Sequence, residues 1–437
     1  MPSHAPASRE LHLNINMLHS GFVPSAWRLP EAQTDALFDV AHYVRLAQVA
    51  ERGAFDAVFL ADTAAISDQV QYRSINALEP TLLLATLAAH TRRIGLIATV
   101  STSYNEPYNI ARRFATLDHI SAGRAGWNIV TTADPASARN FGRDVAIDHQ
   151  ERYARAAEFA DVVKALWHSW QPGAFLGDKN SGYFADPDRI QPIAHQGKFF
   201  SVHGPLTLPP SRQGHPVLVQ AGGSGDGREL AARHAEAVFS ASESIDESRA
   251  YRRDLHERAA KYGRGPNAVS VLAGLTTIIG ATEEAAYRRR DELMDLIPLE
   301  YSVKRLAGTL GVPLESIKLD EPIAQNLALP KNGTHTFFNT TLAAAKRTGA
   351  TARELIREFA GGGGHRVIVG TPEQIADDIE HWFRTEAADG FNLMPDTLPG
   401  GLEDFVDGVV PILRQRGIFR NEYRGDTLRS HLGLGAP

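Results

Sequence analysis

The chain has 437 residues, 43% hydrophobic and 22% charged, as in ordinary globular proteins, and a net charge of −6 at pH 7 that argues against a nucleic-acid-binding surface. Its length suits one large α/β domain with insertions or two domains. The absence of cysteine excludes disulfides, thiolate metal sites and cysteine nucleophiles, and because we find neither a signal peptide nor a membrane-spanning apolar run, we expect a soluble cytoplasmic protein.

Segments typical of strands alternate with segments typical of helices along most of the chain. In chain order, the expected strands are Leu11–Leu18, Ala57–Ala61, Ile94–Ser101, Ala125–Val130, Pro216–Ala221, Ala237–Ala241, Val269–Ile279 and Phe391–Met394. The expected helices are Asp35–Arg52, Pro80–Thr91, Pro107–His119, Asp148–Trp170, Arg228–Ala235, Asp246–Tyr262 and Thr371–Glu386. Eight strands that mostly alternate with helices predict a TIM (β/α)8 barrel rather than a six-stranded open sheet.

Two segments are too long to be simple connections between these elements. One covers about 171–214, and the other covers about 293–365 and ends in the run Gly361–Gly364. We expect both to be insertions near the C-terminal face of the barrel, within a single domain of residues 1–437, where they could shape or cover a pocket. The glycine run could be a hinge or a flexible loop.

The segment Asp118–Thr132, DHISAGRAGWNIVTT, joins the end of a helix to a short buried strand. Asn128 is an amide within this apolar run, and Thr131 and Thr132 stand where the strand should end. Ligands of parallel barrels bind at the C-terminal strand ends. Asn128 could therefore face a ligand, or it could be a core amide whose hydrogen bonds are satisfied within the protein.

Other polar side chains stand at the same predicted end of the barrel. Asp62 ends the second strand, where it could bind a ligand or cap the following turn. Thr99 and Ser101 end the third strand and could offer hydroxyls, although such residues more often simply end a strand at a turn. His149 and Tyr153 are four residues apart, so they share a helix face and could hold a phosphate or a polar ring edge, although such a pair is more often structural.

The most specific local motif is Gln220–Gly227, QAGGSGDG. A strand enters it and a helix leaves it, so free backbone N–H groups and the helix dipole make an anion site. Gly222 and Gly223 allow close approach of the backbone, and Ser224 adds a hydroxyl donor. The motif matches neither a P-loop nor a Rossmann fingerprint, and no HExxH, GxSxG or metal spacing is present. A phosphate-bearing cofactor that carries the chemistry is what remains.

Three stretches resemble one group of flavin-dependent monooxygenases, that of nitrilotriacetate, EDTA, pristinamycin and dibenzothiophene sulfone, in the bacterial luciferase-like superfamily. They are YNEPY followed by ARRFATLDHISAGRAGWNIVTT, then QAGGSGDGRELAARHAEAVF, and GTPEQIADDIEHWFRTEAADGFNLMPDTLPGGLEDFVDGVVPILRQRGIF. The resemblance runs from about Leu11 to Leu434. Gly223 departs from the group, in which serine is common at that position, and this would thin the phosphate contacts.

The resemblance implies a TIM barrel that binds reduced FMN from a separate NAD(P)H-dependent flavin reductase. It implies that O2 is used to oxygenate a small organic substrate through a flavin (hydro)peroxide, often in xenobiotic degradation, by a homodimer or higher homo-oligomer. His19 and Asn128 would be the catalytic residues, with His19 contacting the peroxide or the substrate and Asn128 facing the isoalloxazine. Ser224 and Tyr153 would hold the phosphate. The residues carried over to the FMN site are Asp62, Thr99, Ser101, Asn128, His149, Tyr153, Gly223 and Ser224.

Two alternatives remain open, a deazaflavin-dependent oxidoreductase of the same superfamily and a non-catalytic flavin-binding protein. The group acts on aminopolycarboxylates, sulfones, halogenated aromatics, alkanes and natural products, so the resemblance leaves the substrate open. Loop aromatics hint at an apolar or aromatic guest, although such residues more often only pack. These aromatics are Trp27, Tyr104, Phe199, Phe200, Phe337 and Phe338.

Overall fold

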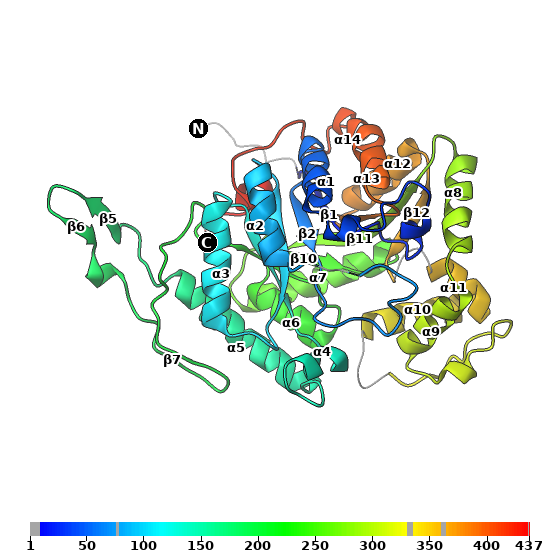
Figure 1. Cartoon of the computed structure of the whole chain (residues 1–437), viewed down its shortest axis with the longest axis horizontal. Helices are drawn as coiled ribbons and strands as arrows, with labels where there is room; N and C mark the ends of the chain where they lie inside the picture. The colour runs from blue at the N-terminus through cyan, green and yellow to red at the C-terminus, as the bar shows by residue number, and fades with distance from the viewer. Residues whose placement is uncertain (1–8, 76–77, 330–334, 360–363, 436) are drawn as a thin grey trace.

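The computed structural model describes residues 9–75, 78–329, 335–359, 364–435 and 437. Parallel strands close into a barrel in the order β10-β9-β4-β3-β2-β1-β13-β11, and β10 pairs with β11 to complete the circle (Figure 1). These eight strands are β1 (His12–Asn16), β2 (Ala57–Leu60), β3 (Gly95–Ser101), β4 (Ala125–Val130), β9 (Val217–Gln220), β10 (Ala237–Ser240), β11 (Ser270–Ile279) and β13 (Gly390–Pro395). The predicted TIM barrel is therefore confirmed, with each strand within a few residues of its expected position.

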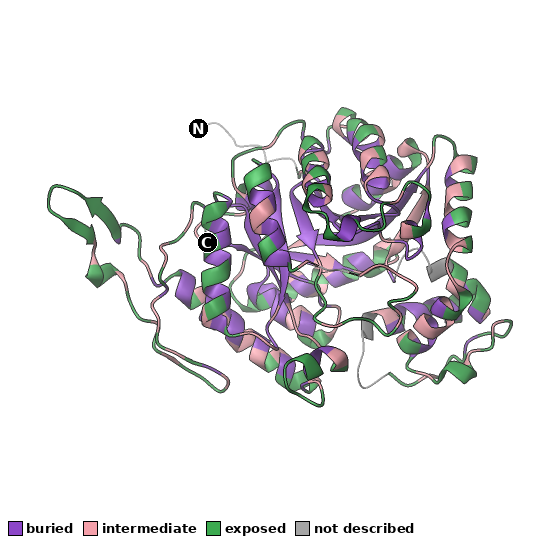
Figure 2. Cartoon of the chain, viewed as in Figure 1, coloured by how far each residue is buried: buried purple, intermediate pink, exposed green. Residues whose placement is uncertain are grey.

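Helices surround the barrel and bury their apolar faces against it (Figure 2). The predicted ones are α1 (Val40–Arg52), α2 (Pro80–His90), α3 (Pro107–Ile120), α5 (His149–Trp167), α6 (Gly225–His234), α7 (Ile245–Lys261) and α12 (Pro372–Arg384). Three predicted bounds were wrong by three residues or more. Helix α1 begins at Val40 rather than at Asp35. Helix α5 ends at Trp167 rather than Trp170, and α6 begins within the glycine-rich turn because Ser224 caps it.

The N-terminal end of the barrel is closed by the last helix of the chain, α15 (Leu428–His431). Leu428 packs inside the barrel with Phe59, Ile97 and other inward-facing side chains. Gly126 makes room for this plug, because a Cβ there would lie 2.9 Å from the Ile97 side chain and 3.2 Å from that of Leu428. The glycine is needed for space at this position rather than for an unusual backbone angle.

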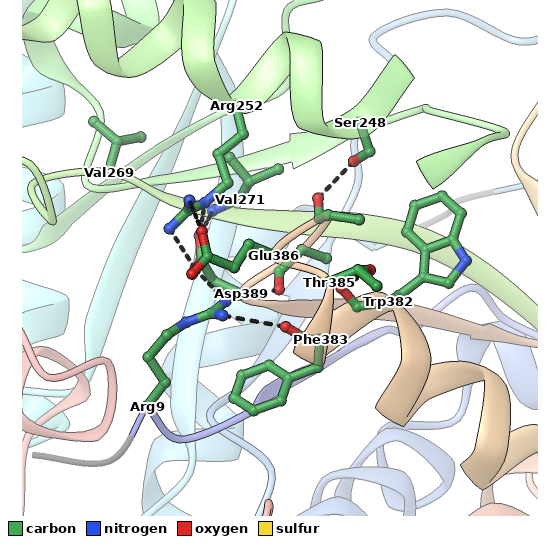
Figure 3. Close-up of polar contacts among 12 residues, drawn as sticks. Arg9, Ser248, Arg252, Val269, Val271, Trp382, Phe383, Thr385, Glu386 and Asp389 are labelled. Atoms are coloured by element: carbon green, nitrogen blue, oxygen red, sulfur yellow. Dashed lines mark hydrogen bonds and ion pairs between the residues drawn. The ribbon is translucent and has the colours of Figure 1, made fainter. Parts of the chain in front are cut away.

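An ionic network ties several elements together at the same end (Figure 3). Asp389 accepts hydrogen bonds from the guanidinium of Arg9 (3.0 Å), that of Arg252 on α7 (3.2 Å) and the N–H of Val271 on β11 (2.9 Å). Arg9 also donates to the carbonyl of Phe383 at 3.1 Å. Because side chains at the N-terminal face of such barrels serve stability rather than catalysis, we assign this network a structural role.

The first insertion, residues 171–214, lies outside the barrel wall, which corrects the expectation that it lies near the mouth. It packs against α3 and α5, with Pro209 accepting a hydrogen bond from His119 at 2.9 Å and Gln213 donating to the carbonyl of Ala125, at the start of β4, at 2.8 Å. Figure 1 shows its hairpin projecting from the body. The strands of this segment are β5 (Phe175–Asp178), β6 (Tyr183–Ala185), β7 (His195–Gln196) and β8 (Ser201–Val202). The error arose because α5 ends at the N-terminal face, so the segment starts there.

The second insertion lies at the mouth, as predicted. It contains helices that the sequence did not predict, and they form a small core of their own around Leu306, Phe338 and Leu355. The helices in and before this segment are α8 (Glu283–Asp295), α9 (Leu299–Leu310), α10 (His335–Thr348) and α11 (Ala352–Phe359). Residues 361–363 of the glycine run lie outside the described residues, so its predicted role as hinge or loop stays a prediction.

Within the main nine-stranded sheet, the strand that was not predicted is β12 (Arg366–Gly370). It pairs with the upper part of β11, residues 275–279, whereas β10 pairs with the lower part, residues 270–273. Since β13 occupies the other edge of β11, β12 takes the edge that β10 leaves. This pairing brings His365, the residue before β12, to the mouth between β10 and β11.

Candidate functional site

The C-terminal ends of β9 and β10 border a cavity of about 580 Å³. Ligand sites in proteins commonly measure about 300–1,000 Å³, so its volume suits a cofactor-sized ligand. The wall combines the loop after β9, the loop after β10 and residues of the second insertion. The lining includes Gly222, Gly223, Ser224, Arg228, Tyr251, Phe337 and His365.

The glycine-rich turn at one end of this cavity is tightly braced. The amide oxygen of Gln220 accepts a hydrogen bond from the N–H of Gly222 at 2.6 Å, and the Tyr251 hydroxyl donates to the Gly222 carbonyl at 2.9 Å. Ser224 caps α6, its hydroxyl oxygen accepting from the N–H of Gly227 at 3.1 Å. The first N–H groups of α6 have no intrahelical acceptor and point with the helix dipole toward the turn. The turn therefore has the geometry of an anion site, and the predicted binding of a phosphate there stays a prediction.

Arg228 adds positive charge to this anion site and was missed from the sequence. Its Nε donates to the Gly223 carbonyl at 3.1 Å, and its guanidinium pairs with Asp254 at 2.9 Å and lies 4.8 Å from the centre of the Tyr251 ring. The spacing of Arg228, one helical turn after the capping Ser224, is the signal that could have found it.

Asn128 and Thr99 stand side by side on β4 and β3, as their register pairs them. The amide nitrogen of Asn128 donates to the Thr99 hydroxyl at 2.9 Å. Its amide oxygen is buried and has no hydrogen-bond partner among the described residues. Buried polar atoms are rarely left without a partner. The interpretation as a satisfied core amide therefore holds for the amide nitrogen but not for the oxygen, and contact of this oxygen with a ligand stays a prediction.

His149 and Tyr153 do share a face of α5, with ring centres 4.8 Å apart. Nε2 of His149 lies 3.0 Å from a carboxylate oxygen of Asp226, in the first turn of α6. This contact brings the start of α5 to the anion site. The structure thus joins two sets of predicted residues that are about seventy positions apart in the sequence.

Ser101 and Asp62 make no contact in this cluster among the interactions that the structure describes. The Ser101 hydroxyl oxygen accepts from the Thr132 hydroxyl (2.6 Å) and from the N–H of Ser103 (3.1 Å), so it supports the turn after β3. Asp62 is exposed after the end of β2. Both lie at the expected end of the barrel, and their contact with a ligand stays a prediction.

His19 is buried after β1, which lies opposite β9 across the barrel. Its Nδ1 accepts hydrogen bonds from the N–H of Ser20 (2.8 Å) and the hydroxyl of Ser74 (2.6 Å). Burial, with Arg73 and His42 nearby, lowers the pKa of His19 to about 3. His19 is therefore neutral at pH 7, and because its Nδ1 accepts, its Nε2 carries the proton.

Of the six aromatic residues that hinted at a guest, Phe337 lines the cavity and contacts His365 edge-on at 5.5 Å. Phe338 is buried in the core of the second insertion. Tyr104 stacks on Phe141 at 4.7 Å, and the Trp27 indole donates to the Tyr72 carbonyl. The other two, Phe199 and Phe200, pack on the outside against α5. Packing thus explains most of them.

Two kinds of site are not found among the described residues. No group of three or more His, Asp or Glu side chains there could hold a metal ion. Within the same ranges, no helix has both the length and the apolar character to cross a membrane.

Comparisons with known proteins agree with this geometry. The family model described as luciferase-like monooxygenase matches residues 20–389. The chain is 43% identical over 430 residues to the N-acetyl-S-(2-succino)cysteine monooxygenase of Bacillus subtilis (strain 168), covering 98% of each. It is 44% identical over 444 residues to nitrilotriacetate monooxygenase component A of Aminobacter aminovorans, covering 99% of this chain and 98% of the relative. The solved structure of a riboflavin lyase with modified FMN and riboflavin superposes with a TM-score of 0.87 at 32% identity, covering 98% of this chain and 96% of the other.

Proposed function

The chain belongs to the luciferase-like monooxygenase family, and on that premise we propose that it is the oxygenase component of a two-component system that works on reduced FMN. The observation that carries the proposal is the anion site at Gly222–Ser224, which opens on a cavity of about 580 Å³ beside Arg228. FMN has one phosphate and a large polar ring, and this cavity offers a place for such a phosphate at one end. The protein would be an enzyme that oxygenates a small organic molecule.

The side chains around the mouth divide the binding of FMN between them. The Ser224 hydroxyl, the first N–H groups of α6 and Arg228 would hold the phosphate, with Tyr153 beside them on α5. The unpartnered amide oxygen of Asn128 would accept a hydrogen bond from an N–H of the ring. Bound reduced FMN would supply the chemistry that activates O2, in which one oxygen atom goes to the substrate and the other leaves as water.

The protein's own part is to exclude water and to orient the reactants. The second insertion lies at the mouth and supplies Phe337 to the cavity wall. His19, which is neutral and opposite the phosphate end, would offer its Nε2–H to the substrate or to the oxygen being transferred. Asp62, Thr99, Ser101 and His149 would complete the FMN surroundings.

Reduced FMN would come from a separate NAD(P)H-dependent flavin reductase. In this proposal the protein works in the cytoplasm, where NAD(P)H is available, as a homodimer or higher homo-oligomer. A deazaflavin-dependent reaction is not favoured, because the two relatives of 43% and 44% identity are named as monooxygenases. The following experiment distinguishes such an enzyme from a protein that binds flavin but catalyses no reaction.

The experiment mixes the anaerobic protein–reduced FMN complex with ¹⁸O2 and N-acetyl-S-(2-succino)cysteine or nitrilotriacetate. We expect tighter binding of reduced FMN than of reduced deazaflavin, and one ¹⁸O atom in the organic product. We also expect the bound flavin to regain its oxidised spectrum more slowly than free flavin does. A carrier would release flavin that reoxidises at the free rate and would yield no labelled product, which would contradict the proposal.

Replacing Asn128 with alanine is expected to weaken FMN binding about tenfold, because one hydrogen bond to a buried acceptor is lost. Quenching of FMN fluorescence during titration measures the affinity. Thr99→Val is the matched variant, since it removes the hydroxyl that fixes the Asn128 amide but keeps the amide oxygen, and a smaller loss is expected. Equal affinities of the wild type and Asn128→Ala would place Asn128 outside the FMN site.

A further inference from the structure

A second cavity of about 360 Å³ adjoins the first. Phe337 and His365 belong to the walls of both. The His365 ring stacks on Phe239 of β10 with ring centres 4.9 Å apart, so it stands at the barrel rim between the two spaces. A ligand in the second cavity would therefore lie next to whatever occupies the first.

The charged side chains that line the second cavity are all positive among the described residues. Arg73 and Arg305 line it, and no Asp or Glu does among the described residues. Neither guanidinium forms an ion pair with any acidic side chain in the part of the chain that the structure describes. Burial, together with nearby Arg73, lowers the pKa of Arg305.

Arg73 and Arg305 are half-buried, so they are partly desolvated and repel each other across a cavity wall that holds no counter-ion among the described residues. Such groups are kept where an anion joins them. A guanidinium is planar and matches a carboxylate with two parallel hydrogen bonds. A carboxylate carried by a ligand would supply the missing counter-ion.

The apolar side chains of the wall indicate the character of the rest of that ligand. Phe22, Ile297, Leu306, Leu355 and Ile356 are apolar, and the volume is small. His365 adds no positive charge at pH 7, because burial and nearby Arg305 lower its pKa to about 4. Ser74, the residue after Arg73, donates a hydrogen bond to His19 at 2.6 Å, so the segment that carries Arg73 joins this cavity to the His19 side of the mouth.

We propose that this second cavity is the substrate site and that the substrates are small organic acids, whose ionised carboxylate is held between Arg73 and Arg305 while the apolar part contacts the wall. This inference rests on the proposed function, because only an enzyme has a substrate. The recognition of a carboxylate by the two arginines does not depend on flavin.

The test is calorimetric titration of the flavin-free protein with three acids, namely succinate, propane-1,2,3-tricarboxylate and N-acetyl-S-(2-succino)cysteine, and with their carboxamides. At least one acid is expected to bind ten times or more tightly than its uncharged amide. Arg305→Gln and Arg73→Gln are each expected to weaken that acid about ten- to a hundredfold while leaving the amide unchanged. Arg288→Gln, on the exposed face of α8, is the control and should bind the acid as the wild type does.

Equal binding of acid and amide, binding of no acid in the set, or an unchanged preference in both arginine variants would overturn the inference. Titration of the same variants with FMN keeps the two proposals apart. Variants that lose the acid but keep FMN support the inference. Failure of the wild type to bind FMN would contradict the proposed function and leave the carboxylate site standing.

Discussion

Replacing Gly222 with alanine is expected to weaken FMN binding about a hundredfold. A Cβ at this position would lie 2.8 Å from the Cα of Gly227 and 2.7 Å from the amide oxygen of Gln220. Real Cβ atoms do not approach backbone this closely, so the turn must open. Opening it breaks the hydrogen bond from the Gly222 N–H to Gln220 and displaces Ser224 from the start of α6. Loss of two hydrogen bonds to a charged phosphate corresponds to about 3 kcal/mol, or roughly a hundredfold.

Gly225 offers a matched control three residues away. A Cβ there meets nothing within 4 Å, and alanine is a better helix former than glycine. Gly225→Ala is therefore expected to keep most of the affinity for FMN. Fluorescence titration gives both affinities, and thermal unfolding of the flavin-free variants shows whether either has lost its fold. Equal affinities for the two folded variants would mean that the turn does not hold the phosphate.

The fold was predictable because buried parallel strands are short apolar runs bounded by turns. That pattern is local, and it located β1, β4 and β11 within a few residues. It failed for β12, where RVIVG follows a glycine run and resembles the end of a loop. The place of the first insertion also escaped prediction, because it depends on where α5 ends in space rather than on the composition of residues 171–214.

The candidate site was predictable where one motif carries it. QAGGSGDG is a contiguous motif, and from it we predicted that Gly223 and Ser224 lie between a strand and a helix, as they do between β9 and α6. Arg73 and Arg305 are more than two hundred positions apart and come from a loop and from a helix of the second insertion. Nothing in the sequence near either arginine says that they share a cavity without a counter-ion. Only the tertiary structure places them together.

Replacing Asp56 with alanine is expected to destabilise the protein by about 3–5 kcal/mol, because it leaves the buried Arg420 without its closest counter-ion. Asp56 is fully buried at the start of β2. One carboxylate oxygen lies 2.5 Å from the Arg420 guanidinium and 3.1 Å from Nδ1 of His12, and the other accepts from the N–H of Leu13 at 2.7 Å. Chemical denaturation at pH 7 measures the loss. Arg45→Ala, which breaks an exposed pair with Glu403, is the control and should cost less than about 1 kcal/mol.

The same carboxylate makes this difference depend on pH. Burial alone would raise the pKa of Asp56, but Arg420, His12 and the Leu13 N–H outweigh it and hold the pKa at about 2. A carboxyl whose pKa is lower in the folded state than in the unfolded state stabilises the fold above the unfolded value of about 4. That contribution is lost as the pH falls from about 4 to about 2. The difference in unfolding free energy between the wild type and Asp56→Ala should therefore shrink over this range, and a difference that stayed constant would show that Asp56 acts through packing rather than through its charge.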